Sequence, residues 1–506
     1  MGKIKSAIIT AILVAAIVVL GVFATVSYTT PGSNGVGKFN SFISSIKLGG
    51  ELSGNAEAVL YPEGVISASE YALYTTGAEE DKLEDYAKYQ KRGSVYVDEN
   101  AFEDYENGEE GFKADVLNDA KVLAKRFGEK GYSGYSVSVQ DDYTVKVSVP
   151  TNFPYAAYAD NGSSLRSSYT SEIERTIGYM FFDGELTLRN TEIGNTGADN
   201  IITPLTADVT SYFKSITNVS AGGNYAVRLN LTKAGRELFK DVTTRITSVA
   251  TEEDDDKAIG FYIGDNKLIA LNVDGTIDSG SFYIGIENGD AALARDYAIV
   301  LNSVANGDVL SLGYGTDDFT VVYKTSALGA IAPVYLGIAL LFIIIAAIIY
   351  SVVRYKKLGL VNALMILIYS LAIIIALMLI EIQLTIAGAV TAVLGLALLC
   401  ASNFALFENV RGETKKGKTM QSAVKSGYKN MLLGILEMHI ILVIVALMLA
   451  LICVGELASC GLIFFIATLA SYVFYWFTRF MWYVLSSPVK DKFKFCGFTR
   501  EEYEND

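Results

Sequence analysis

Hydrophobic residues gather into long runs at the N-terminus and in the last third of the chain, and the middle is polar. The first run extends from about Ser6 to Val26, close to the roughly 20 residues that a helix needs to cross a bilayer. It favours a retained signal anchor over a cleaved signal peptide, because the apolar core of a signal peptide has only about 7–15 residues. Five further spans are predicted at Ala330–Val353, Leu358–Leu379, Ile386–Phe407, Met431–Cys453 and Leu457–Leu485.

Basic residues lie on alternate connections between these runs. Arg354–Lys357 is basic, whereas the turns Glu381–Gln383 and Val454–Glu456 carry no Lys or Arg. Lys3 and Lys5 precede the first run. The loop after the fourth span carries Arg411, Lys415, Lys416, Lys418, Lys425 and Lys429. Because Lys and Arg stay on the cytoplasmic side, both termini are predicted on the cytoplasmic side of the plasma membrane, and residues 29–325 on its outer side.

The polar middle alternates helical and strand patterns. Ala114–Phe127 has apolar residues on one helical face, and strands are predicted at Tyr135–Val139 and Tyr143–Val149 around a tight turn at Gln140–Asp142. Further helices are predicted at Ser167–Tyr179, Thr232–Arg245 and Asp290–Ala305, and strands at Glu185–Arg189, Tyr225–Leu231, Gly260–Ile263 and Lys267–Asn272. This order predicts an α+β domain of ferredoxin-like, split βαβ units.

The predicted fold class is therefore a membrane protein with six transmembrane helices, one before and five after a large extracytoplasmic domain. The domain boundaries that we expect are 1–28 for the first helix, 29–204 for the base of the external domain, 205–308 for its head, 309–329 for a return strand or linker, 330–485 for the five-helix part and 486–506 for a cytoplasmic tail.

Charge and composition exclude several classes of function. The formal net charge of −14 disfavours a nucleic-acid partner, because acidic surfaces repel phosphate. The four cysteines, Cys400, Cys453, Cys460 and Cys496, all lie outside the external domain, so that domain is not a disulfide scaffold.

Enzymatic chemistry finds no support in the motifs. There is no Gly-rich phosphate loop and no HExxH, and His439 is the only histidine. Glu252–Asp256 fits a solvated acidic loop better than a calcium site, because the glycine and terminal glutamate spacing of an EF-hand is missing. We expect no enzyme activity, cofactor or metal.

Several short motifs follow one another in order along the chain. They are Leu48-Gly49-Gly50-Glu51-Leu52-Ser53-Gly54 after the first span, Arg126 in the first external helix, Gly184–Arg189, and Gly235, Phe239 and Thr243. Tyr355, Gly359 and Ala363 follow at the turn that begins the third span, and Thr478-Arg479 lies in the last span. In order and spacing these motifs resemble the SecD branch of the SecD/SecF family, accessory subunits of the bacterial Sec protein-export machinery within the resistance-nodulation-division superfamily. The first motif resembles that family's LGLDLQG.

This resemblance implies a function and partners. It implies six spans with an external base and a mobile head, pairing with a SecF-type six-helix subunit and action at the SecYEG translocon. The pair would use the proton gradient to help pull unfolded exported polypeptides across the membrane from outside.

The fourth span departs from the family at the position that carries protons. Phe407, Glu408 and Arg411 fix the register and Asn403 matches the family asparagine, but Ala401 replaces the family aspartate. Alanine has no proton to exchange, so a relay through this position is excluded.

Glu437 and His439 in the fifth span are the remaining proton-relay candidates, because ionisable groups inside a membrane are costly and usually functional. Two residues apart on a helix, they point about 200° from each other and do not form one site. The alternative is that both are wetted near the cytoplasmic end of the span or paired with Arg411 or Lys429.

The sequence thus favours a divergent SecD-like subunit whose proton coupling is weakened or supplied by the SecF-type partner. A half-size lipid or drug exporter of the same superfamily and a non-transporting membrane scaffold remain as alternatives.

Overall fold

Two compact units make up the protein. The computed structural model describes residues 3–29, 38–76, 86–103, 105–132, 134–159, 164–190, 211–221, 224–249, 258–286, 289–315, 319–453 and 455–486. The first unit takes its described residues from Met1–Asn55, Pro150–Ser167 and Thr325–Asp506, and the second from Ala56–Val149 and Ser168–Lys324.

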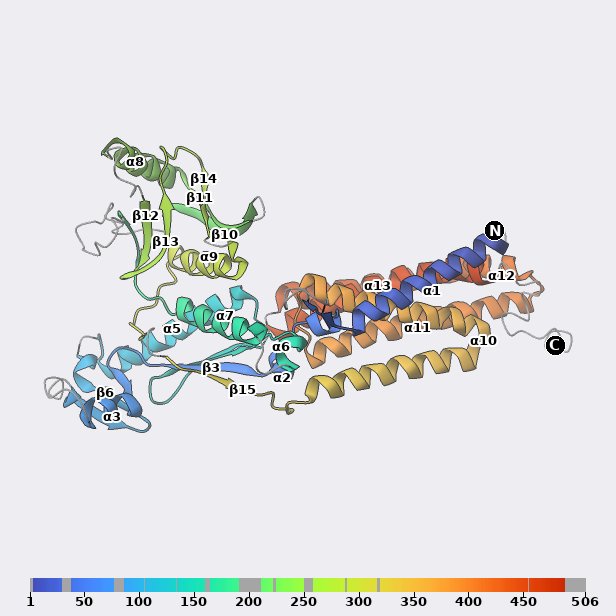
Figure 1. Cartoon of the computed structure of the whole chain (residues 1–506), viewed down its shortest axis with the longest axis horizontal. Helices are drawn as coiled ribbons and strands as arrows, with labels where there is room; N and C mark the ends of the chain where they lie inside the picture. The colour runs from blue at the N-terminus through green and yellow to red at the C-terminus, as the bar shows by residue number, and fades with distance from the viewer. Residues whose placement is uncertain are drawn as a thin grey trace. The chain divides into compact units, whose positions relative to one another are not determined.

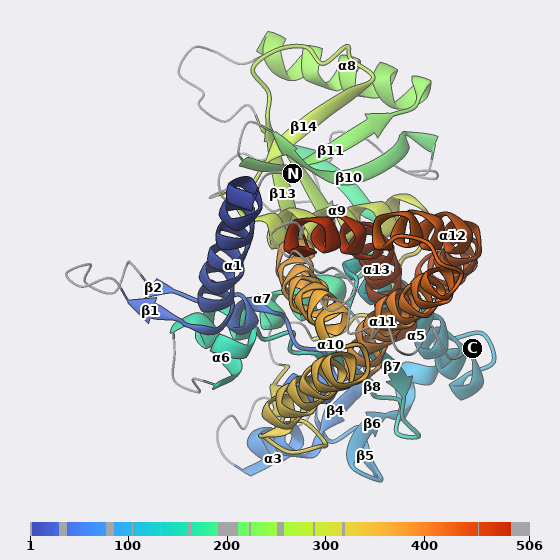
Figure 2. The same ribbon diagram turned by 90° about the vertical axis from the view of Figure 1, so that its right-hand side faces the viewer.

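The first unit is a bundle of long apolar helices. Within the described residues, five helices are long and apolar enough to cross a membrane. They are α1 (Lys3–Thr25), α10 (Ala332–Ile380), α11 (Ile386–Lys415), α12 (Met420–Ile452) and α13 (Glu456–Ser486). The helix α13 contacts each of the other four, as the view along the bundle in Figure 2 shows. All six predicted apolar runs fall in these helices, two of them in α10.

The helix α10 reverses direction in its middle. Its 49 residues would make a straight helix of about 73 Å, more than twice the thickness of a bilayer core. Lys356 has non-helical angles, φ 53° and ψ −119°, and the Asn362 side chain donates to Ser351 Oγ at 2.9 Å. Residues 11 positions apart in a straight helix are about 16 Å apart along its axis. The contact therefore requires two helical segments that fold back on each other (Figure 1).

Short elements complete the first unit next to the helix ends. Thr385 begins α11 by accepting a hydrogen bond from the Gly388 backbone N–H at 2.9 Å, an N-cap. The short elements are β1 (Tyr28–Thr29), β2 (Lys38–Phe39), η1 (Ile43–Ser45), α2 (Gly50–Ser53) and α6 (Tyr155–Ala159).

Within its described residues, the second unit contains four small sheets (Figure 1). Their strand orders are β15-β3-β8-β7, β4-β6-β5, β10-β11-β14 and β13-β12-β9. The strands are β3 (Asn55–Leu60), β4 (Val65–Ser67), β5 (Tyr89–Arg92), β6 (Val95–Asp98), β7 (Ser136–Val139), β8 (Val145–Pro150), β9 (Leu186–Asn190), β10 (Phe213–Ala221), β11 (Asn224–Leu231), β12 (Ala258–Ile263), β13 (Asn266–Asn272), β14 (Ser281–Gly285) and β15 (Val321–Lys324).

Helices pack against these sheets. Asp290 caps α9 by accepting from the backbone N–H groups of Ala292 and Leu293, and Gly131 ends α5 with φ 79°. The helical elements are α3 (Ala68–Thr76), η3 (Glu99–Phe102), α5 (Glu109–Lys130), α7 (Ser164–Met180), α8 (Lys233–Val249) and α9 (Ala291–Ala305). Each helix and strand predicted for the middle of the chain has a counterpart, so an α+β domain is present.

One predicted turn was too short. The connection between β7 and β8 takes five residues, 140–144, instead of Gln140–Asp142. Tyr143 adopts a left-handed φ of 67°, and the Asp142 carboxylate accepts from both the backbone N–H and the hydroxyl of Thr144. These contacts hold the chain out of the strand until Val145.

Candidate functional site in the membrane helices

The motif Leu48–Gly54 forms part of the first unit. Leu48 N–H donates to the Phe153 carbonyl at 3.1 Å, Gly49 N–H donates to the Leu384 carbonyl at 3.0 Å, and Leu384 N–H returns a bond to Lys47 at 2.8 Å. Leu48 and Leu384 thereby form a parallel bridge. The motif is bonded to the turn that connects α10 and α11.

Two glycines of the motif are required by this close packing. A Cβ atom added at Gly49 would lie 2.7 Å from the Thr385 methyl group. Gly54 ends α2 with φ 90°, a conformation that side chains disfavour. Between them Leu52 is buried against Ala332, at the start of α10.

Glu51 connects three segments at one end of the bundle. Its Oε2 accepts from the Ile386 backbone N–H at 3.1 Å, in the first turn of α11, where the helix dipole favours a negative charge. The Ser326 hydroxyl donates to the Glu51 carbonyl.

Asn403 of the fourth-span motif belongs to a buried polar network. Its Nδ2 donates to Asn362 Oδ1 at 2.6 Å, and Asn362 Nδ2 donates to Ser351 Oγ at 2.9 Å. Both asparagines are fully buried, and Asn403 Oδ1 has no hydrogen-bond partner within the described part of the chain. The network joins the two halves of α10 to α11.

The three register residues of this motif lie toward the end of α11. Phe407 is buried, with its ring 5.4 Å from the Tyr355 ring. Glu408 accepts from Arg354 at 3.3 Å, and Arg411 is half-buried. The motif therefore packs against the reversal in α10.

Ala401 lies on the exposed side of α11. The adjacent Ser402 is buried and donates its hydroxyl back to the Leu398 carbonyl at 2.8 Å, so it does not replace the missing carboxylate. This position has no ionisable group to hold a proton.

His439 is buried between α12 and α13. Its Nδ1 lies 2.8 Å from the Ile435 carbonyl and its Nε2 lies 2.9 Å from Ser471 Oγ. Because a carbonyl only accepts, Nδ1 carries a hydrogen. When the ring is neutral, Nε2 accepts a hydrogen bond from the Ser471 hydroxyl. When the ring is charged, Nε2 donates to Ser471 Oγ, and the Ser471 hydroxyl donates instead to the Thr468 carbonyl, 2.8 Å away. The ring can gain a proton without losing either contact.

Glu437 lies on a different face of α12 from His439. It is exposed and makes no ion pair with any described residue. The partners of His439 are Ser471 and Ile435, not Arg411 or Lys429. The two candidates do not form one site.

Arg126 is fully buried in the second unit, and none of the residues that the structure describes gives it a direct carboxylate partner. It donates to Ser303 Oγ at 3.0 Å and to the carbonyls of Met180, Phe182 and Asp308 at 2.6, 3.0 and 3.4 Å. Burial lowers the pKa of Arg126 to about 10, so it remains charged at neutral pH. It holds α5 against the ends of α7 and α9.

Asp119, about two turns earlier along α5, is also fully buried. It accepts from the backbone N–H groups of Ser311 and Leu312 at 2.7 and 3.1 Å, and from Tyr314 at 3.3 Å. Burial raises the pKa of Asp119, and these three donors oppose the rise. The role of both side chains is positional.

Sequence reasoning did not identify Asn362, Ser351 and Ser471 as partners. Each is a polar residue inside an apolar run, a detectable signal, but the sequence does not give the pairing across helices. No group of three or more metal-ligating side chains occurs in the described ranges, and Glu252–Asp256 lies outside them.

Comparisons with known proteins give a consistent likeness. No family model matches the chain. A SecDF protein translocase subunit of Brucella abortus biovar 1 (strain 9-941) is 23% identical over 359 residues, covering 67% of this chain and 43% of that protein. A SecD subunit of Synechocystis sp. is 23% identical over 231 residues, covering 44% of this chain and 45% of that protein. The chain thus spans about half the length of these relatives.

A solved structure gives the same likeness at the level of the fold. A crystal structure of SecDF in a super-membrane-facing form aligns with 96% of this chain and 58% of its own, at 18% identity and a TM-score of 0.57. Together with the apolar helices, this fold defines a multi-pass membrane protein of the SecDF architecture. In sequence the chain is similar to SecD and SecDF proteins, at 23–24% identity, and in fold it is similar to SecDF.

Proposed function

We propose that the chain is an accessory subunit of protein export that helps unfolded polypeptides cross the cytoplasmic membrane from its outer side. The observation that carries this proposal is that curated relatives named as protein translocase subunits match up to 67% of the chain. The agreement of fold over 96% of the chain supports it.

The proposed arrangement has six membrane crossings, with both termini on the cytoplasmic side. The reversal at Lys356 supports it by dividing α10 into two segments of spanning length. In this arrangement residues 29–204 form the base, 205–308 the head, 309–329 the return segment, 330–485 the five-helix part and 486–506 the cytoplasmic tail.

Labelling of single cysteines from the two sides of the membrane tests this orientation. A Ser171→Cys variant is expected to react with an impermeant thiol reagent added outside intact cells. A Lys357→Cys variant is expected to react only after the membrane is opened. Outside labelling of Lys357→Cys in intact cells would overturn the orientation.

The proposed partners are a SecF-type six-helix subunit and the SecYEG translocon. The exposed apolar surfaces of α11 and α12, next to Ala401 and Glu437, give a second helical subunit room to pack. Copurification of both partners with the affinity-tagged chain from mildly solubilised membranes is the expected result. Their absence under conditions that preserve SecYEG itself would overturn the assignment.

Proton coupling, in this proposal, rests mainly on the SecF-type partner. The lack of a titratable group at Ala401 supports this view, and His439 and Glu437 remain as secondary candidates. Glu437→Gln and His439→Gln are each expected to leave most gradient-dependent export intact, and Ala401→Asp is expected not to increase it. If Glu437→Gln abolished the stimulation and Ala401→Asp failed to restore it, the proton site would lie on the fifth span.

A non-transporting scaffold is the second candidate function, because such a protein would tolerate an alanine at position 401 in place of the family aspartate. A scaffold would still be needed for export, but its effect would not depend on the proton gradient.

A further inference from the structure

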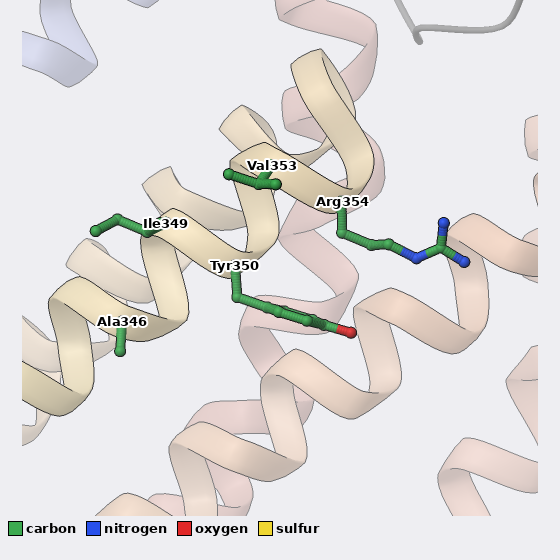
Figure 3. A pocket seen from close by; sticks show the side chains of 5 residues that line it. All are labelled: Ala346, Ile349, Tyr350, Val353 and Arg354. Atoms are coloured by element: carbon green, nitrogen blue, oxygen red, sulfur yellow. The ribbon is translucent and has the colours of Figure 1, made fainter.

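An open groove lies along the first half of α10, close to the reversal at Lys356. Its volume is about 620 Å³, within the range of ligand-binding clefts, about 300–1,000 Å³. It is lined by Ala346, Ile349, Tyr350, Val353 and Arg354 (Figure 3). All five come from two successive turns of one helix.

One part of the groove is polar and basic. Tyr350 and Arg354 extend to the same side of the helix (Figure 3). The Arg354 guanidinium donates to Glu408 at 3.3 Å and lies 5.6 Å from the centre of the Tyr355 ring, and half of its side-chain surface remains exposed. A guanidinium has five N–H donors in a fork that suits phosphate oxygens. Arg354 therefore keeps donors for an anion.

The remaining lining is apolar and uncovered. Ile349 and Val353 are 56% and 75% exposed, although they lie in a segment apolar enough to cross a membrane. In a bilayer such a surface faces acyl chains. The apolar surface of Ile349 and Val353 therefore lies within about one helical turn of the Arg354 guanidinium, at the end of the first half of α10.

We infer that this groove binds a phospholipid with an anionic headgroup. Its phosphate would accept from the Arg354 guanidinium, and its acyl chain would cover Ile349 and Val353. Charge complementarity favours an anionic lipid over a neutral one, and the basic turn Arg354–Lys357 adds to it. The inference rests on the proposed six-span arrangement, which puts Arg354 at headgroup level.

Quenching of a tryptophan reporter by brominated lipids tests this inference. Trp476 and Trp482 are replaced by phenylalanine in the full chain, and Ile349→Trp places the only reporter in the groove. The protein is reconstituted in phosphatidylcholine vesicles that contain brominated phosphatidylglycerol or brominated phosphatidylcholine. The expected result is about a fivefold preference for phosphatidylglycerol at the reporter, the size of the effect of one basic side chain near an anionic surface.

Matched variants separate the site from general attraction. Arg354→Gln is expected to remove the preference, and Glu408→Gln to increase it by freeing the guanidinium. Arg479→Gln, on α13, is expected to leave it unchanged. A control reporter at the exposed Leu394 of α11, Leu394→Trp, is expected to show no preference.

Three results would overturn the inference. They are an unchanged preference in Arg354→Gln, an equal preference at the Leu394 reporter, and absence of quenching by either lipid, which would mean that another protein surface covers the groove. Because this assay needs no export partner, a failure of export stimulation with intact lipid preference would count against the proposed function alone.

Discussion

At the scale of single residues, an ion pair inside the second unit joins three helices. Lys130 of α5 lies 2.6 Å from Asp296 of α9, and their side chains are 8% and 0% exposed. Thr176 of α7 donates to the other oxygen of Asp296 at 2.8 Å. Removing one member of a buried pair leaves an uncompensated charge, which costs more than the intact pair contributes.

Lys130→Met is therefore expected to destabilise these helices by about 3–5 kcal/mol. The free energy of opening of the α5 and α9 backbone amides, from hydrogen exchange on the full chain, measures the effect. The double variant Lys130→Met, Asp296→Leu is expected to recover most of the loss. If the single variant left the exchange rates of both helices unchanged, the ion pair would not stabilise the packing of these helices.

Glu109 predicts an acid dependence of the second unit. Hydrogen bonds from Tyr143, Lys113 and Arg92 lower the pKa of Glu109 from 4.5 to about 2. A carboxyl group whose pKa is lower in the folded state stabilises the fold above its unfolded pKa, and this contribution is lost as the pH falls through the folded pKa.

The melting temperature of Glu109→Gln is accordingly expected to lie below that of the wild type at pH 6. The difference should shrink between about pH 4.5 and pH 2. Thermal unfolding followed by circular dichroism in detergent measures it, with the exposed Glu110→Gln as the matched control. A difference that stays constant down to pH 2 would contradict the assigned contacts.

The residue types in the sequence predicted the chemistry of single positions in the candidate site, but not which residues pair across helices. The lack of a proton carrier at Ala401 follows from its chemistry alone, and the separation of Glu437 from His439 follows from helix periodicity. The partners Asn362 and Ser471 come from other helices, and helix packing is not encoded in local periodicity. The bond from the Ile386 backbone N–H to Glu51 joins residues 335 positions apart, for which the sequence carries no local signal.

At the scale of elements, the reversal in α10 depends on Gly359. A Cβ atom added there would lie 1.8 Å from the Ser351 carbonyl oxygen. No side chain fits this approach, so the two helical segments meet only with glycine at this position.

A thiol cross-link tests the reversal. In a chain without native cysteines, Ser351→Cys and Asn362→Cys are expected to be bridged by one molecule of a short bifunctional reagent, detected by intact mass. Adding Gly359→Val is expected to abolish the bridge. The matched pair Val424→Cys and Ile435→Cys has the same spacing in the uninterrupted helix α12, about 16 Å, and should take two reagents. Two reagents on the 351/362 pair would contradict the reversal.

The sequence pattern predicted secondary structure best where the apolar signal extends over many residues. The apolar runs all coincide with helices, because a spanning helix needs about 20 apolar residues and leaves a plain signal. The strands β3 to β6, β10 and β14 were not predicted. They are short or bear polar residues on one face, and their partners are distant in sequence, such as β15 beside β3. Tertiary pairing, not local propensity, forms such strands.

At the scale of the whole molecule, the chain combines a bundle of apolar helices with an α+β unit, and we propose that it acts in polypeptide export. Within the bundle, position 401 holds alanine and has no group that exchanges protons, and the Leu48–Gly54 motif is hydrogen-bonded to the turn before α11. The central claim is that the chain speeds export and does so with help from the proton gradient.

Pulse-chase export in cells depleted of this chain tests that claim most directly. Release of a secreted protein is expected to slow severalfold on depletion and to be restored by the wild-type chain, and the difference is expected to disappear when the proton gradient is collapsed. An unchanged export rate after depletion would contradict the assignment to export. A depletion effect of the same size with the gradient collapsed would contradict the gradient-linked role.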